Sequence, residues 1–192
     1  MKTTDKRLEQ RIMDSATSFI FQKGVRGWSM DQLAATAGLA KNTLYKMVSS
    51  KEDLVEKVIV EYVQGIQSKM VAIIDNEPDY LTALDRMAEH FSEVVGGPHI
   101  NILQEVFMDY PSIEETVYRH RDELTVRIIR FLEEGINKGI LRSDLEPGLI
   151  FQMLQALVLY FARSTSEGPE LRGKLKLAFK CLINGVRAQQ SL

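Results

Sequence analysis

The chain has 192 residues, of which 45% are hydrophobic and 26% are charged. This composition excludes a disordered chain, which would be poorer in apolar residues, and a membrane protein, which would carry fewer charges. A single cysteine, Cys181, excludes a disulfide framework and a cysteine-rich zinc site. No apolar signal segment follows the first residues, and the longest apolar stretch, 149–162, is shorter than the ~20 residues of a bilayer span. We therefore expect a cytoplasmic protein with no membrane partner.

The charges divide unevenly along the chain. Residues 1–51 carry nine Lys and Arg against four Asp and Glu, a net charge of +5, whereas the remainder carries 15 against 22, a net charge of −7. A basic N-terminal part predicts a polyanionic partner there. Ordinary variation in surface charge would give the same asymmetry, so this alternative stays open.

Apolar residues recur at helical spacing along the whole chain, which predicts an all-α fold. The first helix spans 6–23. A capping box, Ser29 followed three residues later by Gln32, starts the second helix. Gly38 then permits a tight turn before a short third helix at 40–47. Six further helices bring the total to about nine: 50–74, 80–95, 100–108, 112–139, 147–163 and 169–189.

The second and third helices form a unit that is typical of DNA recognition. A helix-turn-helix needs a small residue where its helices nearly touch, a glycine at the turn, and outward polar side chains on the second helix. Ala34 is the small residue and Gly38 is the turn. The polar side chains are Lys41, Asn42, Thr43, Tyr45 and Lys46. This spacing also arises by chance, so by itself it is an incomplete indication of DNA binding.

The wider stretch around this unit is more specific. It contains Leu33-Ala34, Ala37-Gly38, Thr43-Leu44-Tyr45 and Ser50-Lys51-Glu52-Asp53-Leu54. With these motifs, residues 8–55 closely resemble the DNA-binding domain of TetR-family transcriptional regulators. The rest of the chain is similar to that family in length and helix order. The resemblance implies an N-terminal three-helix helix-turn-helix DNA-binding domain at 1–50 and a C-terminal helical ligand-binding and dimerisation domain at 51–192.

Three residues depart from the family pattern. Ala40 stands where the family usually has serine or threonine, so the third helix loses a side-chain cap. Met47 and Val48 stand where an aromatic pair is common. Val48 can still fill the core, whereas Met47 cannot donate a hydrogen bond to a phosphate. These changes affect the affinity and the set of contacts rather than the fold.

The resemblance places seven residues at the DNA. Lysines neutralise phosphates, hydroxyl groups and helix N-termini bind phosphate oxygens, and asparagine can bond to both N6 and N7 of adenine. Three alternatives stay open: Ser29 as a helix cap alone, Tyr45 packed against the first helix, and Lys51 simply solvated. The predicted DNA contacts are Ser29, Lys41, Asn42, Thr43, Tyr45, Lys46 and Lys51.

The last two predicted helices are candidates for a homodimer interface. The stretch 149–162 is apolar nearly all round, so it needs cover on more than one side. By resemblance, these two helices form a four-helix interface with their copies. The alternative is that both are core of a single chain. The predicted interface residues are Phe151, Leu154, Leu157, Val158, Phe161, Leu175, Phe179 and Leu182.

The resemblance also implies a ligand pocket among the middle helices. Flexible methionines and rigid aromatics suit a small hydrophobic molecule. Ordinary core packing is the alternative for each residue taken singly. The predicted lining is Tyr62, Met87, Phe91, Gln104, Phe107, Tyr118, Arg121, Gln152 and Gln155.

The sequence offers no motif for catalysis or for a cofactor. It contains no GxSxG, no phosphate-cradling glycine loop and no HExxH. Its histidines lack a metal-ligand spacing and are expected at the surface or at a pocket edge. We therefore expect no enzyme, but a dimeric repressor that binds a palindromic operator in double-stranded DNA and is released by a small hydrophobic ligand. Two alternatives remain: a DNA-binding member of the family without such a ligand, and a helical scaffold or enzyme.

Overall fold

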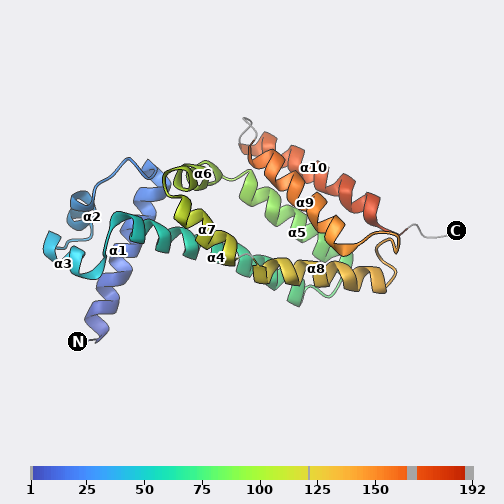
Figure 1. The fold of residues 1–192 in the computed structure, drawn as a ribbon, viewed down its shortest axis with the longest axis horizontal. Coiled ribbons are helices and arrows are strands. Elements are labelled where there is room, and N and C mark those ends of the chain that lie inside the picture. The colour runs from blue at the N-terminus through green and yellow to red at the C-terminus, as the bar shows by residue number, and fades with distance from the viewer. Residues whose placement is uncertain (1, 121, 164–167, 189–192) are drawn as a thin grey trace. The chain divides into compact units, whose positions relative to one another are not determined.

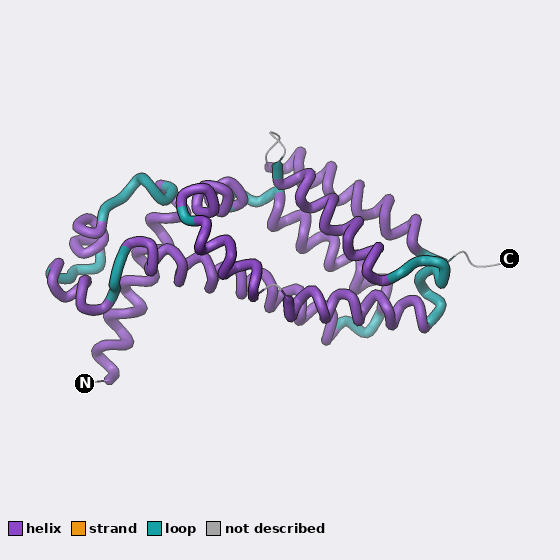
Figure 2. The backbone as a smooth tube through the Cα atoms, in the orientation of Figure 1, coloured by secondary structure: helices purple, strands orange, loops and turns teal. Residues whose placement is uncertain are grey.

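The computed structural model describes residues 2–120, 122–163 and 168–188. These residues form ten helices, and among them the only bridge between extended segments joins Leu141 and Arg187 (Figures 1 and 2). The all-α prediction is confirmed. The helices are α1 (Lys2–Lys23), α2 (Met30–Thr36), α3 (Lys41–Met47), α4 (Lys51–Asn76), α5 (Tyr80–Val95), α6 (Ile100–Asp109), α7 (Pro111–His120), α8 (Asp122–Asn137), α9 (Pro147–Ala162) and α10 (Gly168–Val186).

The chain divides into two compact units, and each has its own core. Unit 1 comprises residues 1–64 and 101–119, and unit 2 comprises residues 65–100 and 120–192. This division differs from the predicted domain boundary at residue 50, because residues 51–64 of α4, together with α6 and most of α7, group with the N-terminal helices. The described helices include none that is long and apolar enough to cross a bilayer.

The core of unit 1 follows the apolar stripes that the sequence predicts. Ile12 and Ile20 of α1, Leu33 of α2 and Leu44 of α3 are fully buried. Val48, the smaller substitute for an aromatic residue, is also buried and so fills the core as expected. Buried apolar side chains thereby anchor α1, α2 and α3 within unit 1.

Two acidic side chains of α6 bind the loop that follows α1. The backbone N–H of Val25 donates to a carboxylate oxygen of Glu105 over 3.2 Å, and Arg26 Nε donates to Asp109 Oδ2 over 2.8 Å. Gly24, at φ +71°, lies so close to Glu105 that an added Cβ would come within 2.7 Å of Oε2. These contacts join residues more than 75 positions apart, and they explain why α6 belongs to unit 1.

Unit 2 is built around α5, which lies beside α9 and α10, with α8 packed on α9 (Figure 1). Its core includes Met87 of α5, Leu132 of α8 and Phe179 of α10. The ring of Tyr80 stacks on Phe131 at 4.3 Å between centroids, and its hydroxyl donates to the Phe131 carbonyl over 3.0 Å. Burial raises the pKa of the Tyr80 phenol, so this hydroxyl remains a hydrogen-bond donor.

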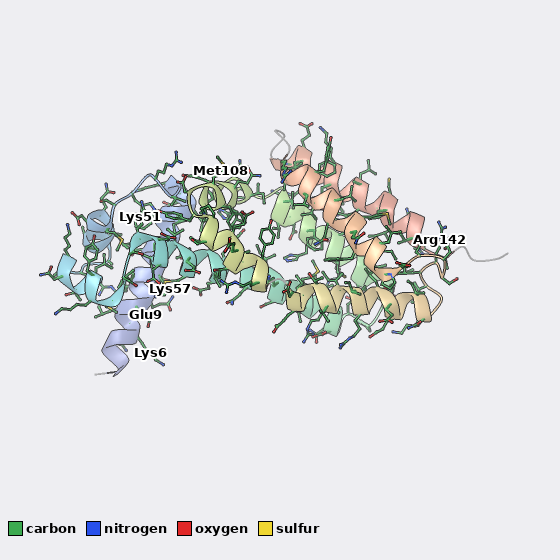
Figure 3. The ribbon with its side chains drawn as sticks, in the orientation of Figure 1. Lys6, Glu9, Lys51, Lys57, Met108 and Arg142 are labelled. Atoms are coloured by element: carbon green, nitrogen blue, oxygen red, sulfur yellow. The ribbon has the colours of Figure 1, made fainter. Side chains whose placement is uncertain are left out.

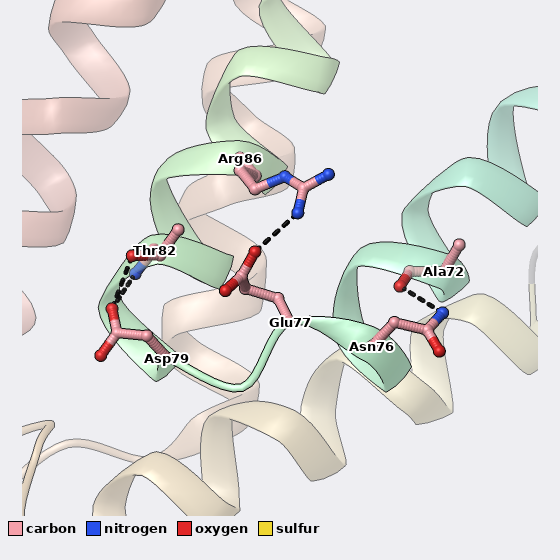
Figure 4. A network of polar contacts seen from close by, with 6 residues as sticks. All are labelled: Ala72, Asn76, Glu77, Asp79, Thr82 and Arg86. Atoms are coloured by element: carbon pink, nitrogen blue, oxygen red, sulfur yellow. Dashed lines mark hydrogen bonds and ion pairs between the residues drawn. The ribbon is translucent and has the colours of Figure 1, made fainter.

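Side chains close the turn between α4 and α5 (Figure 4). Asp79 caps α5, since its carboxylate accepts from the backbone N–H of Thr82 over 2.8 Å and from the Thr82 hydroxyl over 2.6 Å. Arg86 pairs with Glu77 across the turn at 2.6 Å. An N-cap of this kind contributes about 1 kcal/mol to helix stability.

Two helices are described where the sequence predicts one from 112 to 139. Helix α7 begins at Pro111, because proline has no N–H to leave unpaired in a first turn. The hydroxyl of Ser112, where the predicted helix begins, donates to Glu52 over 2.9 Å. Arg121, between α7 and α8, lies outside the described residues.

Candidate nucleic-acid interface

The turn between α2 and α3 forms as the sequence predicts. The Ser29 hydroxyl accepts from the N–H of Gln32 over 3.2 Å, and the Gln32 side chain accepts from the N–H of Ser29 over 2.9 Å, which confirms the capping box. Gly38 adopts φ +63°, and the N–H of Leu39 donates to the Ala34 carbonyl over 2.8 Å. This closure ends α2 and sets the direction in which α3 begins.

Arg11 completes this turn, and sequence reasoning missed it. Its Nη2 donates to the carbonyl of Ala37, at the C-terminal end of α2, and lies 2.6 Å from where a Cβ on Gly38 would be. A cation at a helix C-terminus is favourable both as a donor and against the helix dipole. No local pattern reveals this role, because Arg11 and Ala37 are 26 residues apart.

Helix α3 presents a polar, exposed face. Leu44 is fully buried and anchors the helix, whereas Lys41, Asn42 and Lys46 are exposed and Thr43 is half-buried. Tyr45 is 46% exposed, which argues against the alternative that it packs away against α1. The N-terminus of α3 has no side-chain cap at Ala40, as its sequence predicts. Five of the seven predicted DNA contacts therefore lie together on one short helix.

Lys41 is held by a neighbour on α2. Its Nζ lies 2.7 Å from Oδ1 and 2.9 Å from Oδ2 of Asp31. Hydrogen bonding to this carboxylate raises the pKa of the Lys41 ammonium. Sequence reasoning did not identify Asp31 as part of the interface, because two residues ten positions apart on different helices reveal a pair only once the turn between them is known.

Lys51, the first residue of α4 (Figure 3), has partners inside unit 1. Its Nζ donates to the Trp28 carbonyl over 2.7 Å and lies 4.3 Å from the centroid of the Trp28 ring. Burial lowers the pKa of this ammonium. Lys51 is thus not simply solvated, and its contacts stabilise the loop before α2.

Unit 2 contains an apolar cavity of about 100 Å³ between α5, α8 and α9. Its polar side chains are Thr125 and Gln155. A smaller cavity of about 20 Å³ lies among α5, α8, α9 and α10. The larger cavity is lined by Phe91, Leu124, Thr125, Ile128, Phe151, Leu154, Gln155, Val158 and Leu159.

The predicted ligand residues are only partly brought together. Phe91 and Gln155 line the larger cavity, and Met87 with Phe91 lines the smaller one. Gln152 is exposed on α9. Four others, Tyr62, Gln104, Phe107 and Tyr118, belong to unit 1, and Arg121 lies outside the described residues. Aromatic content alone does not distinguish a cavity lining from the packing of unit 1.

Two of the predicted interface residues lie in the core of unit 2. Leu175 and Phe179 are fully buried against the other helices of this unit, so they cannot contact a partner directly. The half-buried ones are Phe151, Leu154, Leu157, Val158, Phe161 and Leu182. The most exposed apolar residues of α9 and α10 are instead Leu149, Leu159, Tyr160 and Leu177, which the apolar stripe alone did not separate from the core.

His90 departs from the expectation of a surface histidine. It is buried, and its Nε2 lies 2.9 Å from the carbonyl oxygen of Ile66. Among the described residues, no group of three or more His, Cys, Asp and Glu is placed to hold a metal ion.

These observations have counterparts in known proteins. Residues 12–58 match the family described as bacterial regulatory proteins, tetR family. Over 148 residues the chain is 23% identical to the HTH-type transcriptional repressor KstR2 of Rhodococcus jostii, a match that covers 75% of this chain and 72% of the relative. The chain thus contains a tetR-family domain at residues 12–58. It is also 21% identical over 152 residues to the fatty acid metabolism regulator protein of Bacillus subtilis, covering 77% and 76% of the two chains.

Solved structures share the TetR fold. A TetR/AcrR-family regulator from Thermobifida fusca superposes with a TM-score of 0.76 at 21% identity, covering 94% of this chain and 98% of that one. The protein is thus a TetR-type transcriptional regulator that binds DNA through the helix-turn-helix of α2 and α3.

Proposed function

We propose that this TetR-family protein is a dimeric repressor that binds a palindromic operator and is released by a small apolar ligand. The observation that carries the DNA-binding part is the exposed polar face of α3, anchored by the buried Leu44. A helix-turn-helix dimer reads two half-sites one helical turn apart, which requires two copies of this face. Residues 1–50 would supply the DNA-binding domain and residues 51–192 the ligand-binding and dimerisation domain, in the cytoplasm where operator DNA is found.

The cavity of unit 2 supports the proposal that the protein binds a small apolar ligand. Its lining is aliphatic and aromatic, with Thr125 and Gln155 as polar groups that could orient one end of a ligand. One relative is named as a fatty acid metabolism regulator, and a structural neighbour is named as the ketosteroid regulator KstR2. Fatty acids and ketosteroids, which these two names mention, are mainly apolar, as is the lining of the cavity.

The exposed apolar residues of α9 and α10 support the proposal that the protein is a dimer. Tyr160 is 73% exposed and Leu177 is 63% exposed. Exposed apolar side chains gathered on neighbouring helices are typical of an interface. A second copy is the partner that the two-fold symmetry of a palindromic operator requires.

Selection of duplexes from a random pool tests the function. The wild-type protein should select a palindromic motif, with an affinity that falls steeply with salt because lysines displace counterions. Recovery of no motif, or of a motif without symmetry, would contradict the proposal.

Two variants on α3 distinguish a contact to a base from a contact to a phosphate. Asn42→Ala should relax the base preference at one position of each half-site, at a cost of about 1–3 kcal/mol if its contact is bidentate. Lys46→Ala should weaken binding to all sequences alike, because a phosphate contact carries no sequence information. It should reduce the salt slope by about 1 for each protomer, or about 2 for the dimer. Repeating the selection with each variant distinguishes the two roles, and an unchanged motif for Asn42→Ala would remove that residue from base recognition.

The second candidate function is a regulator that responds to no small molecule. The cavity can be tested directly by thermal shift with decanoate and with a steroid ketone as probes. If neither these nor a wider set of apolar compounds stabilises the protein, the ligand-independent alternative is favoured.

A further inference from the structure

Beside the exposed face of α3 lies a carboxylate of α2, that of Asp31, which no DNA-contact role requires. Asp31 lies in the first turn of α2, where the helix dipole favours an acid. Its two oxygens lie 2.7 and 2.9 Å from Lys41 Nζ. The two side chains are 63% and 58% exposed, so the pair lies at the surface that would face DNA.

The sequence around Lys41 explains why it needs a partner. Lys41 is the first residue of α3, a position where a positive charge is unfavourable, and the first turn of α3 contains no acidic residue. Ala40 provides no cap either. Asp31 therefore supplies from α2 the negative charge that α3 lacks.

The Asp31–Lys41 pair should affect non-specific DNA binding and operator binding in opposite ways. Non-specific binding depends almost entirely on the charge that a protein presents to phosphates. While Lys41 is paired with Asp31, the two side chains together have no net charge. Lys41 therefore contributes little to non-specific DNA affinity. In a closely docked complex, by contrast, two-point contact with Asp31 limits the freedom of a flexible four-carbon side chain, so less entropy is lost when the ammonium reaches a fixed atom of the DNA.

We propose that Asp31 is a specificity-determining residue, which lowers non-specific DNA affinity by holding the Lys41 ammonium while preserving its position for the operator. The inference rests on the proposed operator binding. It assigns to an acidic residue on α2 a role in discrimination between sequences, although the residue itself need not touch the DNA.

Binding of Asp31→Asn to two duplexes tests the inference. One duplex is that selected by the wild-type protein, and the other has the same length and a scrambled sequence. For the scrambled duplex, Asp31→Asn should bind more tightly than wild type and steepen the salt slope by about 0.9 for each protomer that contacts the DNA. For a dimer the change is about 1.8, so that the gain in affinity is about twelvefold larger at 50 than at 200 mM salt. For the selected duplex the gain should be smaller, so the ratio of the two affinities falls.

Two further proteins make the test specific. Glu9→Gln changes the net charge of unit 1 equally at an exposed position on α1 (Figure 3), and it should leave the ratio of affinities unchanged. In a Lys41→Ala background, Asp31→Asn should no longer lower the ratio, because the ammonium that it releases is absent. Circular dichroism and thermal melts establish that all variants are folded.

Several outcomes would overturn the inference. They are an equal gain on both duplexes, no gain on the scrambled duplex, or an Asp31→Asn effect that persists without Lys41. Failure of the wild-type protein to select any duplex would instead contradict the proposed function, and the scrambled-duplex measurements with and without Lys41 would still decide whether Asp31 withholds that charge.

Discussion

At the α2–α3 turn, one residue has both a special backbone conformation and a close side-chain neighbour. Gly38 combines a positive φ of +63° with a position beside Arg11, whose guanidinium binds the last turn of α2. A side chain at this position would therefore have two separate costs: a backbone that L-residues rarely adopt, and displacement of the arginine from its carbonyl.

Gly38→Ala should destabilise the protein by about 2 kcal/mol, about half from the backbone and half from the weakened Arg11 bond. Gly139→Ala is the matched control, since Gly139 has φ +68° but no neighbouring atom within 4 Å of an added Cβ. This control should cost only about 1 kcal/mol. Urea unfolding of both variants measures the difference, and equal costs would show that the Arg11 contact contributes nothing to stability.

At the level of helices, the interior glycines of α8 and α4 have different surroundings. In α8, a Cβ on Gly135 would overlap the Tyr80 hydroxyl, so the glycine permits close packing with α5. In α4, a Cβ on Gly65 would meet nothing within 4 Å. Packing thus requires glycine in α8 and does not require it in α4.

Alanine substitutions at these positions should have opposite signs. Gly65→Ala should stabilise the protein by about 0.5–1 kcal/mol, because alanine has the higher helix propensity and meets no obstacle. Gly135→Ala should destabilise it by about 1–3 kcal/mol through overpacking against Tyr80. Denaturant midpoints measure both, and destabilisation by Gly65→Ala would reveal a conformational requirement in α4 that packing does not explain.

For the whole molecule, assembly should depend on the exposed apolar residues of α9 and α10. Leu177→Glu places a charge at a residue that the single chain leaves 63% exposed, so the fold should survive while the dimer weakens. Val126→Glu on α8, at another exposed apolar residue, is the control and should stay dimeric. Sedimentation at micromolar concentration distinguishes these outcomes, and a wild-type monomer would contradict the proposed dimer.

Ligand and operator should also be coupled across the whole molecule. If a compound in the cavity weakens operator binding, then operator DNA must weaken that compound by the same factor, typically equivalent to 1–3 kcal/mol. Leu124→Trp fills the cavity and should abolish the thermal shift given by the compound, while ligand-free operator binding stays nearly intact. Val126→Trp, on an exposed part of the same helix, should change neither. Unchanged operator affinity at saturating ligand would exclude the coupling.

Local sequence patterns were sufficient to predict the helices and the helix-turn-helix. Helical periodicity, the Ser29–Gln32 capping box and the turn at Gly38 are local, because each depends on residues within a few positions of one another. These features predicted the all-α fold and the polar face of α3, whereas the family was indicated by the resemblance of residues 8–55. The structure confirms the fold and the turn.

Contacts between residues far apart in the sequence were seen only in the tertiary structure. The Arg11 cap, the Asp31–Lys41 pair and the hold of Glu105 on the loop after α1 join residues from different elements. The same is true of burial: Phe179 and Leu177 are both apolar residues of α10, yet one is core and the other is 63% exposed. Periodicity shows that a helix has an apolar face, but which neighbour covers which part of that face depends on how the helices pack together, and the sequence of one helix contains no information about that packing.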